Sequence, residues 1–362
     1  MERWALSLLL RRTPSNMKAA FLVGPNHFDV REIPDLVAPS DGLVLKVEAC
    51  GVCGSDLRRW KEGPIAGSEP LIPGHEISGT VIGVGALISD YHPGDQLAVA
   101  PDVHCGKCYY CQRGFYNLCD QLHLVGITSG YPGGFSEKMI LTEEVLTNGV
   151  VHRIPAGLTF EEAALAEPLS SVLACHANLG TSLQDTVVVM GAGPIGCMHI
   201  AIAKARGALV ILSEPSALRR EMAQVFQPEY VVDPFQKNLR EIVLSATGHV
   251  GADIVICANP VAATHTQAVE VVRKHGKIVL FGGLPKASPM TSLNGNLIHY
   301  GEVQVVGSFS YHPTFHALAL QTIHRQQVRA DQLITDTFPL EKINEAFQAA
   351  ASGNSLKVII KM

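Results

Sequence analysis

The sequence predicts an α/β protein with two domains, one mostly β and one built on a doubly wound parallel sheet with crossover helices. Three observations support this prediction. The 362 residues exceed the length at which a single hydrophobic core keeps growing. Short apolar runs separated by Gly and Pro turns extend from Met17 to about Leu141, which is typical of β structure. After residue 185, β-branched runs alternate with helix-like segments, which is typical of a parallel sheet.

The composition favours chemistry on a small molecule. A net charge of −5 with both signs interspersed provides no basic face for nucleic acid and no polybasic membrane patch. No apolar run reaches the roughly 18 residues of a membrane span. Four of the nine cysteines form one short cluster, which indicates metal binding rather than a disulfide framework. We therefore expect a reducing, cytoplasmic compartment.

The first sixteen residues do not resemble the rest of the chain. Residues 4–10 are apolar and two arginines follow, but no small-residue cleavage site completes a secretory signal. Met17 then opens a plausible first strand, residues 18–23. We expect residues 1–16 to be an N-terminal extension of the two domains.

The stretch from Gly51 to Glu76 carries the donor types that bind zinc. Cys53 would supply sulfur and His75 a ring nitrogen, and Ser55 stands where it could accept a substrate proton. The alternative is a buried Cys and His pair that holds no metal.

Another candidate is Glu167, which lies with Pro168 in an apolar run. A carboxylate there is costly unless it is paired or metal-bound, so Glu167 could join the metal of Cys53 and His75. It could equally mark the surface entry of a helix.

The strongest spacing signal is a cluster of four cysteines within fifteen residues, Cys105, Cys108, Cys111 and Cys119. Four thiolates so close together can complete a tetrahedral zinc shell that leaves no place for water, which describes a structural metal. An iron–sulfur cluster would need a shorter last gap and usually a following Pro, whereas Asp120 follows here.

A glycine motif marks a dinucleotide site. The β-branched strand 186–190 is followed at once by Gly191, Ala192, Gly193, Pro194, Ile195 and Gly196, and a helix pattern continues to Arg206. The first glycine permits a tight turn, the second lets backbone approach a pyrophosphate, and the third lets the helix pack on the strand. The helix N-terminus then faces the phosphates.

The next strand, 208–212, indicates which dinucleotide binds. It leads to Glu214, eighteen residues past Gly196, where a carboxylate would accept hydrogen bonds from both ribose hydroxyls and repel a 2′-phosphate. This favours NAD over NADP. Arg219 and Arg220 leave NADP open, because either could reach a phosphate if Glu214 turned away; Glu214 could also be a solvated loop residue.

Later strand ends add candidates for the cofactor site. Gly282 and Gly283 follow one strand pattern and Ser308 follows another. Because parallel sheets bind ligands at the C-terminal ends of their strands, these residues should border the nicotinamide. A final strand, 356–360, should return to the first domain.

The motifs of the chain occur in an order that is similar to the order in one protein family. They are Gly-Val-Cys-Gly-Ser-Asp, Pro-Gly-His-Glu, four clustered cysteines, Glu-Pro-Leu and Gly-Ala-Gly-Pro-Ile-Gly. From Met17 to its end, the chain resembles the zinc-dependent medium-chain dehydrogenases, and within them the polyol (sorbitol-like) branch. The resemblance implies a GroES-like catalytic domain from residues 17–170 and 309–362. It implies a Rossmann coenzyme domain from residues 171–308.

The resemblance also implies roles for individual residues. Cys53 and His75 would hold the catalytic zinc with a carboxylate from Glu76 or Glu167, and Ser55 would take the first proton. A second zinc would lie in the four-cysteine cluster, with Glu214 on the ribose and Lys357 near the pyrophosphate. It further implies a homodimer or homotetramer.

One position departs from the family pattern. Relatives usually place a His five residues after the ligating Cys to pass the proton outward, but Arg58 occupies that position here and cannot act as a base. Arg58 could contact substrate or cofactor while water carries the proton, or His104 or His123 could substitute. The sequence does not choose among these alternatives for the outer proton path.

We expect a zinc enzyme that transfers hydride between a secondary alcohol (a polyol, sugar or cyclitol) and NAD. Trp60 and the Glu167-Pro168-Leu169 segment slightly favour polyols or sugars over the amino alcohols of a threonine-dehydrogenase-like enzyme. A catalytically silent dinucleotide-binding protein is the alternative from another class, and the intact ligand, glycine and serine positions disfavour it.

Overall fold

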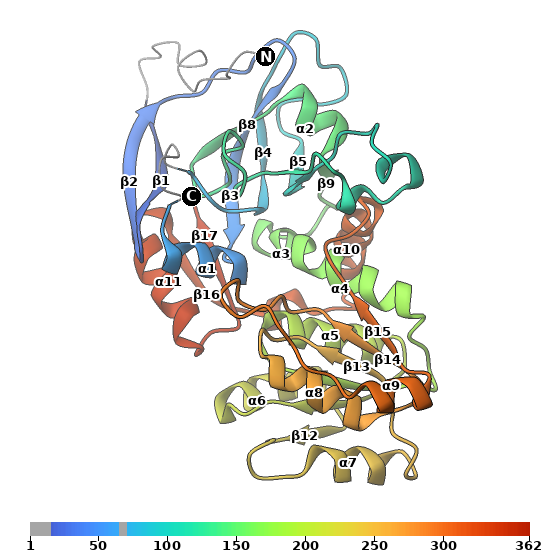
Figure 1. Cartoon of the computed structure of the whole chain (residues 1–362). Coiled ribbons are helices and arrows are strands. Elements are labelled where there is room, and N and C mark those ends of the chain that lie inside the picture. Colours follow the sequence, from blue (N-terminus) through green and yellow to red (C-terminus); the bar gives the residue numbers. More distant parts are fainter. Residues whose placement is uncertain (1–15, 65–70) are drawn as a thin grey trace. The chain divides into compact units, whose positions relative to one another are not determined.

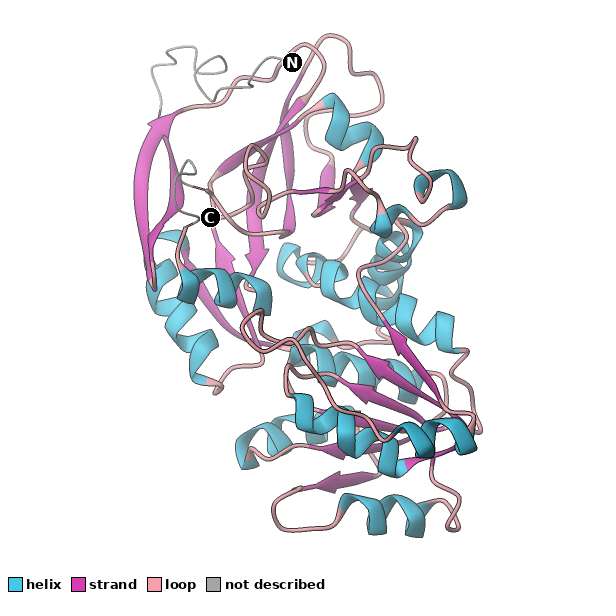
Figure 2. Cartoon of the chain, in the orientation of Figure 1, coloured by secondary structure: helices cyan, strands magenta, loops and turns pink. Residues whose placement is uncertain are grey.

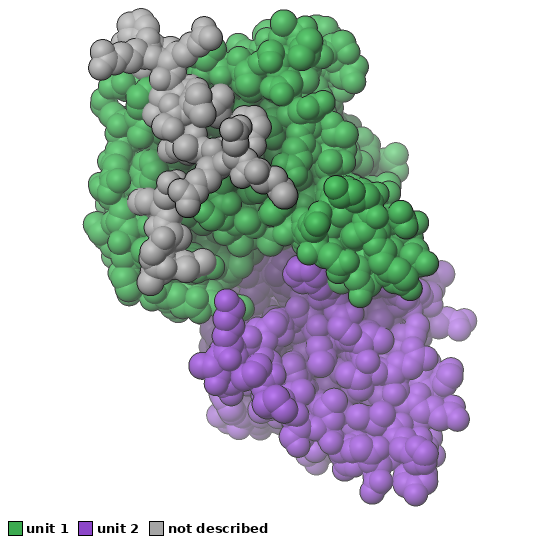
Figure 3. Space-filling model, turned by 45° about the horizontal axis from the view of Figure 1, so that its top comes forward, with its two compact units in different colours: residues 1–170, 311–326, 330–362 green, residues 171–310, 327–329 purple. Residues whose placement is uncertain are grey.

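The computed structural model of the chain describes residues 16–64 and 71–362 (Figure 1). The chain divides into two compact units, which Figure 3 colours separately. Unit 1 comprises residues up to Ser170 with Tyr311–Gln326 and Ala330–Met362, and unit 2 comprises Ser171–Ser310 and Gln327–Arg329. The expected N-terminal extension lies outside the described residues except for Asn16, which begins the first strand.

Unit 1 is mostly β structure. Its main sheet has seven strands in the order β16-β17-β3-β4-β5-β9, with β8 paired to β3, and two small sheets pair β1 with β2 and β6 with β7. The strands are β1 (Asn16–Gly24), β2 (His27–Pro34), β3 (Leu43–Gly51), β4 (Glu76–Val84), β5 (Gln96–Ala100), β6 (Asp102–Val103), β7 (His123–Leu124), β8 (Lys138–Leu141), β9 (Val150–Arg153), β16 (Ile334–Pro339) and β17 (Lys357–Lys361).

Short helices complete this unit, and the longer α4 contains the boundary between the units. The helices are α1 (Gly54–Glu62), α2 (Glu143–Asn148), α3 (Phe160–Ala164), α4 (Ala166–Leu179), α10 (Thr314–His324) and α11 (Ile343–Ser352), with 3₁₀ turns at Cys111–Arg113, Tyr116–Leu118, Ala330–Gln332 and Leu340–Lys342.

The core of unit 1 is centred on aromatic side chains. The ring of Phe347 lies 4.7 Å from Phe28, 5.6 Å from Phe135 and 5.7 Å from Trp60, measured between centroids. Trp60 is buried in this cluster. It therefore stabilises the core, and its expected influence on substrate choice loses its support.

Unit 2 is a six-stranded parallel sheet in the order β12-β11-β10-β13-β14-β15, with helices on both sides (Figure 2). Its strands are β10 (Thr186–Met190), β11 (Leu209–Ser213), β12 (Tyr230–Val232), β13 (Ala252–Cys257), β14 (Val272–Leu280) and β15 (Gln304–Gly307). Its helices are α5 (Pro194–Ala205), α6 (Ala217–Ala223), α7 (Leu239–Ala246), α8 (Ala262–Val271) and α9 (Gly295–Gly301), with a 3₁₀ turn at Gln224–Phe226. This strand order is that of a dinucleotide-binding fold, as predicted.

Proline explains one departure from the predicted elements. The expected helix start is present, because Thr159 caps α3 and exchanges hydrogen bonds with Glu162. The apolar helix expected to continue from residue 163 is instead broken at Leu165. Pro168 has no N–H to donate to the Ala164 carbonyl and its ring would collide with it, so a new helix begins at Ala166. Within the described ranges, no helix is long and apolar enough to cross a bilayer.

Candidate functional site

Three neighbouring strands bring a buried ion pair into the middle of the main sheet of unit 1. Gly51 of β3 lies opposite Glu76 of β4 and opposite Ile359 of β17, two residues from Lys357. The ammonium of Lys357 donates to the Glu76 carboxylate at 2.5 Å and to the Val52 carbonyl at 3.1 Å. Glu76 is fully buried and Lys357 is 2% exposed, so each charge depends on the other.

Position 51 requires a glycine because it faces the Glu76 carboxylate. A Cβ placed on Gly51 would lie 1.9 Å from Oε2 of Glu76, far inside van der Waals contact. The sequence stretch that opens with Gly51 thus needs this glycine for space rather than for a turn.

A group of side chains that could hold a cation lies where α1 and β4 begin. The Cys53 sulfur, a His75 ring nitrogen and a Glu76 carboxylate oxygen lie within 4.8 Å of one another. Cys53 is the residue before α1, and its N–H donates to Asp56 Oδ2 at 3.0 Å. The other oxygen of Asp56 is 3.3 Å from His75 Nδ1, an ion-pair contact without hydrogen-bond geometry. Because this carboxylate faces Nδ1, Nε2 is the ring nitrogen left for a metal.

The electrostatics of this group favour a positive charge. Burial lowers the pKa of His75, but the carboxylate of Asp56 and the sulfur of Cys53 raise it, and the pKa ends well above the usual 6.5. A zinc ion would satisfy the same anionic surroundings. Sulfur, nitrogen and oxygen donors from three residues leave a fourth coordination position for a substrate, as in catalytic zinc sites. The residues therefore fit zinc.

Glu167 lies outside this group of three. It stands in the first turn of α4, and its Oε1 accepts a hydrogen bond from the Tyr311 hydroxyl at 3.0 Å. Burial raises the pKa of Glu167 to about 7, with the charges of Glu76 and Asp102 acting in the same direction and His75 against it. The geometry thus groups Glu76, and not Glu167, with Cys53 and His75.

Ser55, Arg58, His104 and His123 are the residues considered for the proton path beyond the site. Ser55 Oγ, in the first turn of α1, is 3.4 Å from His75 Nε2, and Arg58 is exposed one turn further on. The His104 ring packs on Tyr116 and the His123 ring stacks on Tyr131. Among the hydrogen bonds of the described residues, none joins the side chains of His104 or His123 to Ser55.

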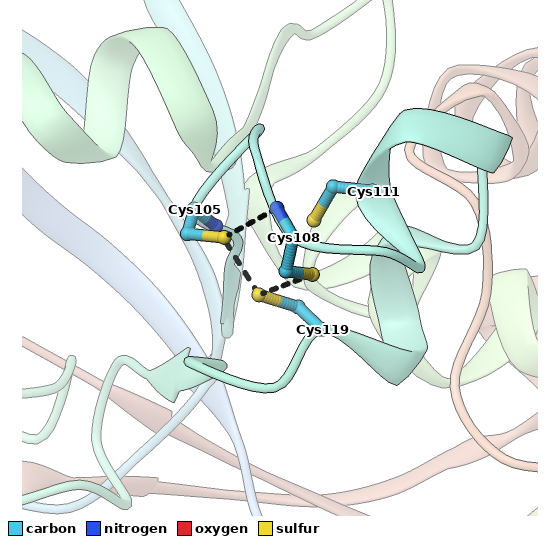
Figure 4. Close-up of side chains that lie close together, drawn as sticks. All are labelled: Cys105, Cys108, Cys111 and Cys119. Carbon is cyan, nitrogen blue, oxygen red and sulfur yellow. Dashed lines mark hydrogen bonds between the residues drawn. The ribbon is translucent and has the colours of Figure 1, made fainter.

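The four clustered cysteines point their sulfurs toward one another (Figure 4). The sulfurs of Cys108 and Cys119 are 3.9 Å apart, close to the roughly 3.8 Å edge of a tetrahedron with zinc–sulfur bonds of about 2.3 Å. Backbone N–H groups lower the pKa of Cys108 to about 6, whereas burial raises that of Cys111 to about 12. Without a cation the four cannot all ionise, so the cluster fits a structural zinc.

All nine cysteines lie in the described part of the chain and all have free thiols. The four clustered cysteines are therefore available as metal ligands.

The glycine motif in unit 2 has the geometry expected of a phosphate loop. Gly191 has φ +110°, which other residues rarely adopt, and a Cβ on Gly196 would lie 1.9 Å from the Gly191 carbonyl oxygen. Gly193 precedes α5, and Pro194 opens it. A Cβ built on Gly193 would have a guanidinium nitrogen of Arg219 as its nearest neighbour, at 3.5 Å. This leaves the helix N-terminus open to an anion.

Glu214 is held against the same loop. Its two oxygens accept hydrogen bonds from the backbone N–H groups of Ala192 and Ser216, at 2.7 and 2.8 Å, and the residue is 6% exposed. It is therefore an ordered acceptor and not a solvated loop residue. Arg220 is bound to the Glu214 and Pro215 carbonyls and pairs with Asp233, so Arg219 is the arginine nearer the loop.

The remaining cofactor candidates lie at strand ends. Gly282 and Gly283 follow β14, where a Cβ on Gly282 would lie 2.4 Å from the Asn259 carbonyl oxygen, and Ser308 follows β15. The Lys357 ammonium is hydrogen-bonded to the Glu76 carboxylate in unit 1. Its expected contact with the pyrophosphate stays a prediction.

Sequence reasoning assigned no role to Asp56, Gly51 or Tyr311. A signal existed for Asp56, because a carboxylate three residues after a helix N-cap commonly returns to the cap. No local signal connects Tyr311 to Glu167, which lies 144 residues earlier.

Comparison with known proteins gives a consistent result over nearly the whole chain. A family model described as the alcohol dehydrogenase GroES-like domain matches residues 39–153, and one described as zinc-binding dehydrogenase matches residues 194–325. The sorbitol dehydrogenase of Halalkalibacterium halodurans is 32% identical over 341 residues, 93% of this chain and 96% of that protein.

Solved structures show the same likeness. A Sinorhizobium meliloti protein described as a zinc-binding dehydrogenase, bound to NADP, is 30% identical with a TM-score of 0.87, over 96% of this chain and 100% of that one. The 2R,3R-butanediol dehydrogenase of Bacillus subtilis is 27% identical with a TM-score of 0.86, over 96% of this chain and 99% of that one.

Proposed function

Because the chain belongs to the zinc-dependent medium-chain alcohol dehydrogenase family and resembles its polyol branch, we propose that it oxidises a secondary hydroxyl of a polyol or other vicinal diol, with NAD as hydride acceptor. The observation that carries this proposal is the convergence of Cys53, His75 and Glu76. Sorbitol and 2,3-butanediol, named for two of the similar proteins, share a secondary alcohol with a neighbouring hydroxyl.

The residues of unit 1 have separate roles in the proposed reaction. A zinc ion held by Cys53, His75 and Glu76 would supply charge that lowers the pKa of a bound alcohol. Ser55 Oγ lies beside His75, where it accepts the alcohol proton. Asp56 holds His75 in the ligating orientation, and Tyr311 holds the carboxylate of Glu167 beside the site.

The residues of unit 2 bind the dinucleotide. The glycine loop and the α5 N-terminus receive the pyrophosphate, and Glu214 receives the ribose hydroxyls. Glu214 supports NAD, because its buried carboxylate would meet a 2′-phosphate with like charge. Replacing Glu214 with Ala should raise the Michaelis constant for NAD much more than that for NADP.

Activity measurement on a substrate panel tests the proposal. NADH absorbance is followed with polyols, sugars, inositols and L-threonine, and zinc is measured in the same preparation. Cys53→Ala should abolish turnover while NADH still binds, and Cys50→Ala, three residues away in β3 and outside the three-donor group, should retain it. Turnover by Cys53→Ala would refute the metal role, and preference for L-threonine would favour the amino-alcohol alternative. NADH binding without alcohol-dependent turnover would indicate a silent relative.

We also propose a homodimer or homotetramer in the cytoplasm. The edge strand β15 has exposed ends at Gln304 and Gly307, and Tyr300 just before it is 77% exposed. An unpaired strand edge is a surface on which a second copy can continue the sheet. Light scattering on Tyr300→Glu against the native chain would test this interface.

A further inference from the structure

Three polar side chains form a continuous buried chain inside unit 2. Thr181 Oγ1 is 2.9 Å from Nδ1 of His176, in the last turn of α4, and His176 Nε2 is 3.1 Å from Nδ1 of His199 in α5. Both imidazoles are completely buried. Nε2 of His199 has no hydrogen-bond partner among the described residues, but its ring is perpendicular to that of Phe281, with 4.5 Å between centroids.

The surroundings favour one direction for these hydrogen bonds. Burial lowers the pKa of His176 to about 3 and that of His199 well below its usual range, so both rings are neutral and carry one N–H each. If Thr181 donates to His176, then His176 donates to His199, whose own N–H is left on Nε2, in the ring that stands perpendicular to that of Phe281. An aromatic ring accepts such a donor weakly where its face is presented. The opposite direction would leave a buried acceptor nitrogen unsatisfied, which costs about 1–3 kcal/mol.

Phe281 leads directly into the glycines at the end of β14. The Gly282 N–H donates to the Cys257 carbonyl at 3.0 Å, and its backbone packs against Asn259. The adjacent Ala258 N–H donates to the Met190 carbonyl at 2.9 Å, next to the glycine loop. The segment 281–283 therefore lies along the same edge of the sheet as the phosphate loop.

We propose that the chain of Thr181, His176 and His199 positions the nicotinamide half of the cofactor by holding Phe281, and with it Gly282 and Gly283. This inference rests on the proposed function, because it takes these glycines to border the nicotinamide. The three are positioning residues: they are buried, and they act only through Phe281.

Two ligands that differ by the nicotinamide ring distinguish positioning of that ring from a general loss of stability. NADH contains the nicotinamide, whereas ADP-ribose lacks it and keeps the adenosine, the pyrophosphate and the second ribose. Thr181→Val, which keeps the side-chain shape but removes the hydroxyl, and His199→Leu should each weaken NADH binding roughly 3- to 10-fold. ADP-ribose binding should stay unchanged. Fluorescence titration measures NADH, and competition against it measures ADP-ribose.

The same unit provides a matched control. His265 is also buried, its Nδ1 is 3.1 Å from Thr291 Oγ1, and its Nε2 has no hydrogen-bond partner among the described residues. No ring contact between described residues involves His265. Thr291→Val should therefore change neither affinity.

Parallel weakening of NADH and ADP-ribose, unchanged NADH binding, or an equal effect of Thr291→Val would each overturn the inference. If His199→Leu does not fold, the milder Thr181→Val decides the question. These titrations need no alcohol, so a protein that binds NADH but oxidises no polyol refutes the proposed reaction and leaves this test intact.

Discussion

Replacing Lys357 with Met tests the buried ion pair at the centre of the candidate metal site. The substitution keeps a long side chain on β17 but removes the only cation within 2.5 Å of the Glu76 carboxylate among the described residues. Removing one partner of a buried pair costs about 3–5 kcal/mol, because the other charge stays buried without compensation. For a unit of this size, that corresponds to a fall in melting temperature of roughly 6–20 °C.

The same strand contains a control. Lys361 pairs with Glu161 at the same 2.5 Å, but its side chain is 54% exposed. Exposed pairs contribute about 0–1 kcal/mol, so Lys361→Met should lower the melting temperature only slightly. The contrast isolates burial as the cause, because the two substitutions are chemically identical.

Tryptophan fluorescence reports this unit selectively. The chain has two tryptophans, and Trp60 lies in the core of unit 1, so a Trp4→Phe background leaves a single probe. Unfolding is followed in chelator-treated protein and again after zinc is restored. Zinc would give Glu76 a second cationic partner. It should therefore reduce the fall in melting temperature caused by Lys357→Met and leave the fall caused by Lys361→Met unchanged. An equal fall in melting temperature for both variants without zinc, or no recovery of Lys357→Met with zinc, would refute the reasoning.

Three further substitutions have defined outcomes. Gly51→Ala puts a Cβ 1.9 Å from Glu76 Oε2, so elemental analysis should show loss of the catalytic zinc while the four-cysteine zinc is retained; full zinc content would contradict this. Tyr311→Phe removes the donor to Glu167 and should lower turnover roughly tenfold at unchanged zinc content; equal turnover would exclude a role for the bond. Burial lowers the pKa of His316 to about 3, below its unfolded value near 6.5, so native stability should fall as pH drops below about 6.5, by up to about 1.4 kcal/mol per pH unit. In His316→Leu, urea unfolding at pH 7.5 and 5 should show a shallower loss than in the native chain, and identical losses would rule out this contribution.

The parts of the site that could be predicted are those contiguous in sequence. The glycine loop and the four cysteines lie within segments of six and fifteen residues. Local geometry alone brings such groups together, because a tight turn or a short loop leaves the chain few other arrangements. The parallel sheet of unit 2 was also predicted, because strand patterns that alternate with helix patterns are typical of parallel strands joined by crossover helices.

The contacts that could not be predicted join distant segments. Lys357 and Glu76 are 281 residues apart and meet only because β17 and β4 both pair with β3. Side-chain alternation can show that a strand has a buried face, but it does not show which strand will lie beside it. Trp60 illustrates the same limit. It shares the buried face of α1 with Asp56, yet Asp56 meets His75 while Trp60 packs on Phe347.

The choice between Glu76 and Glu167 depends on where β4 begins. In a regular strand His75 and Glu76 would point to opposite faces, so adjacency in sequence would argue against their sharing a metal. The strand begins only at Glu76, and Gly74 turns the chain just before it with φ +96°. A Cβ on Gly74 would lie 2.8 Å from the Cys50 sulfur, so no larger residue fits this turn. The turn frees His75 from the strand's alternation, and both side chains can reach Cys53. We infer that Glu76 completes the three-donor group and that Glu167 acts from outside it.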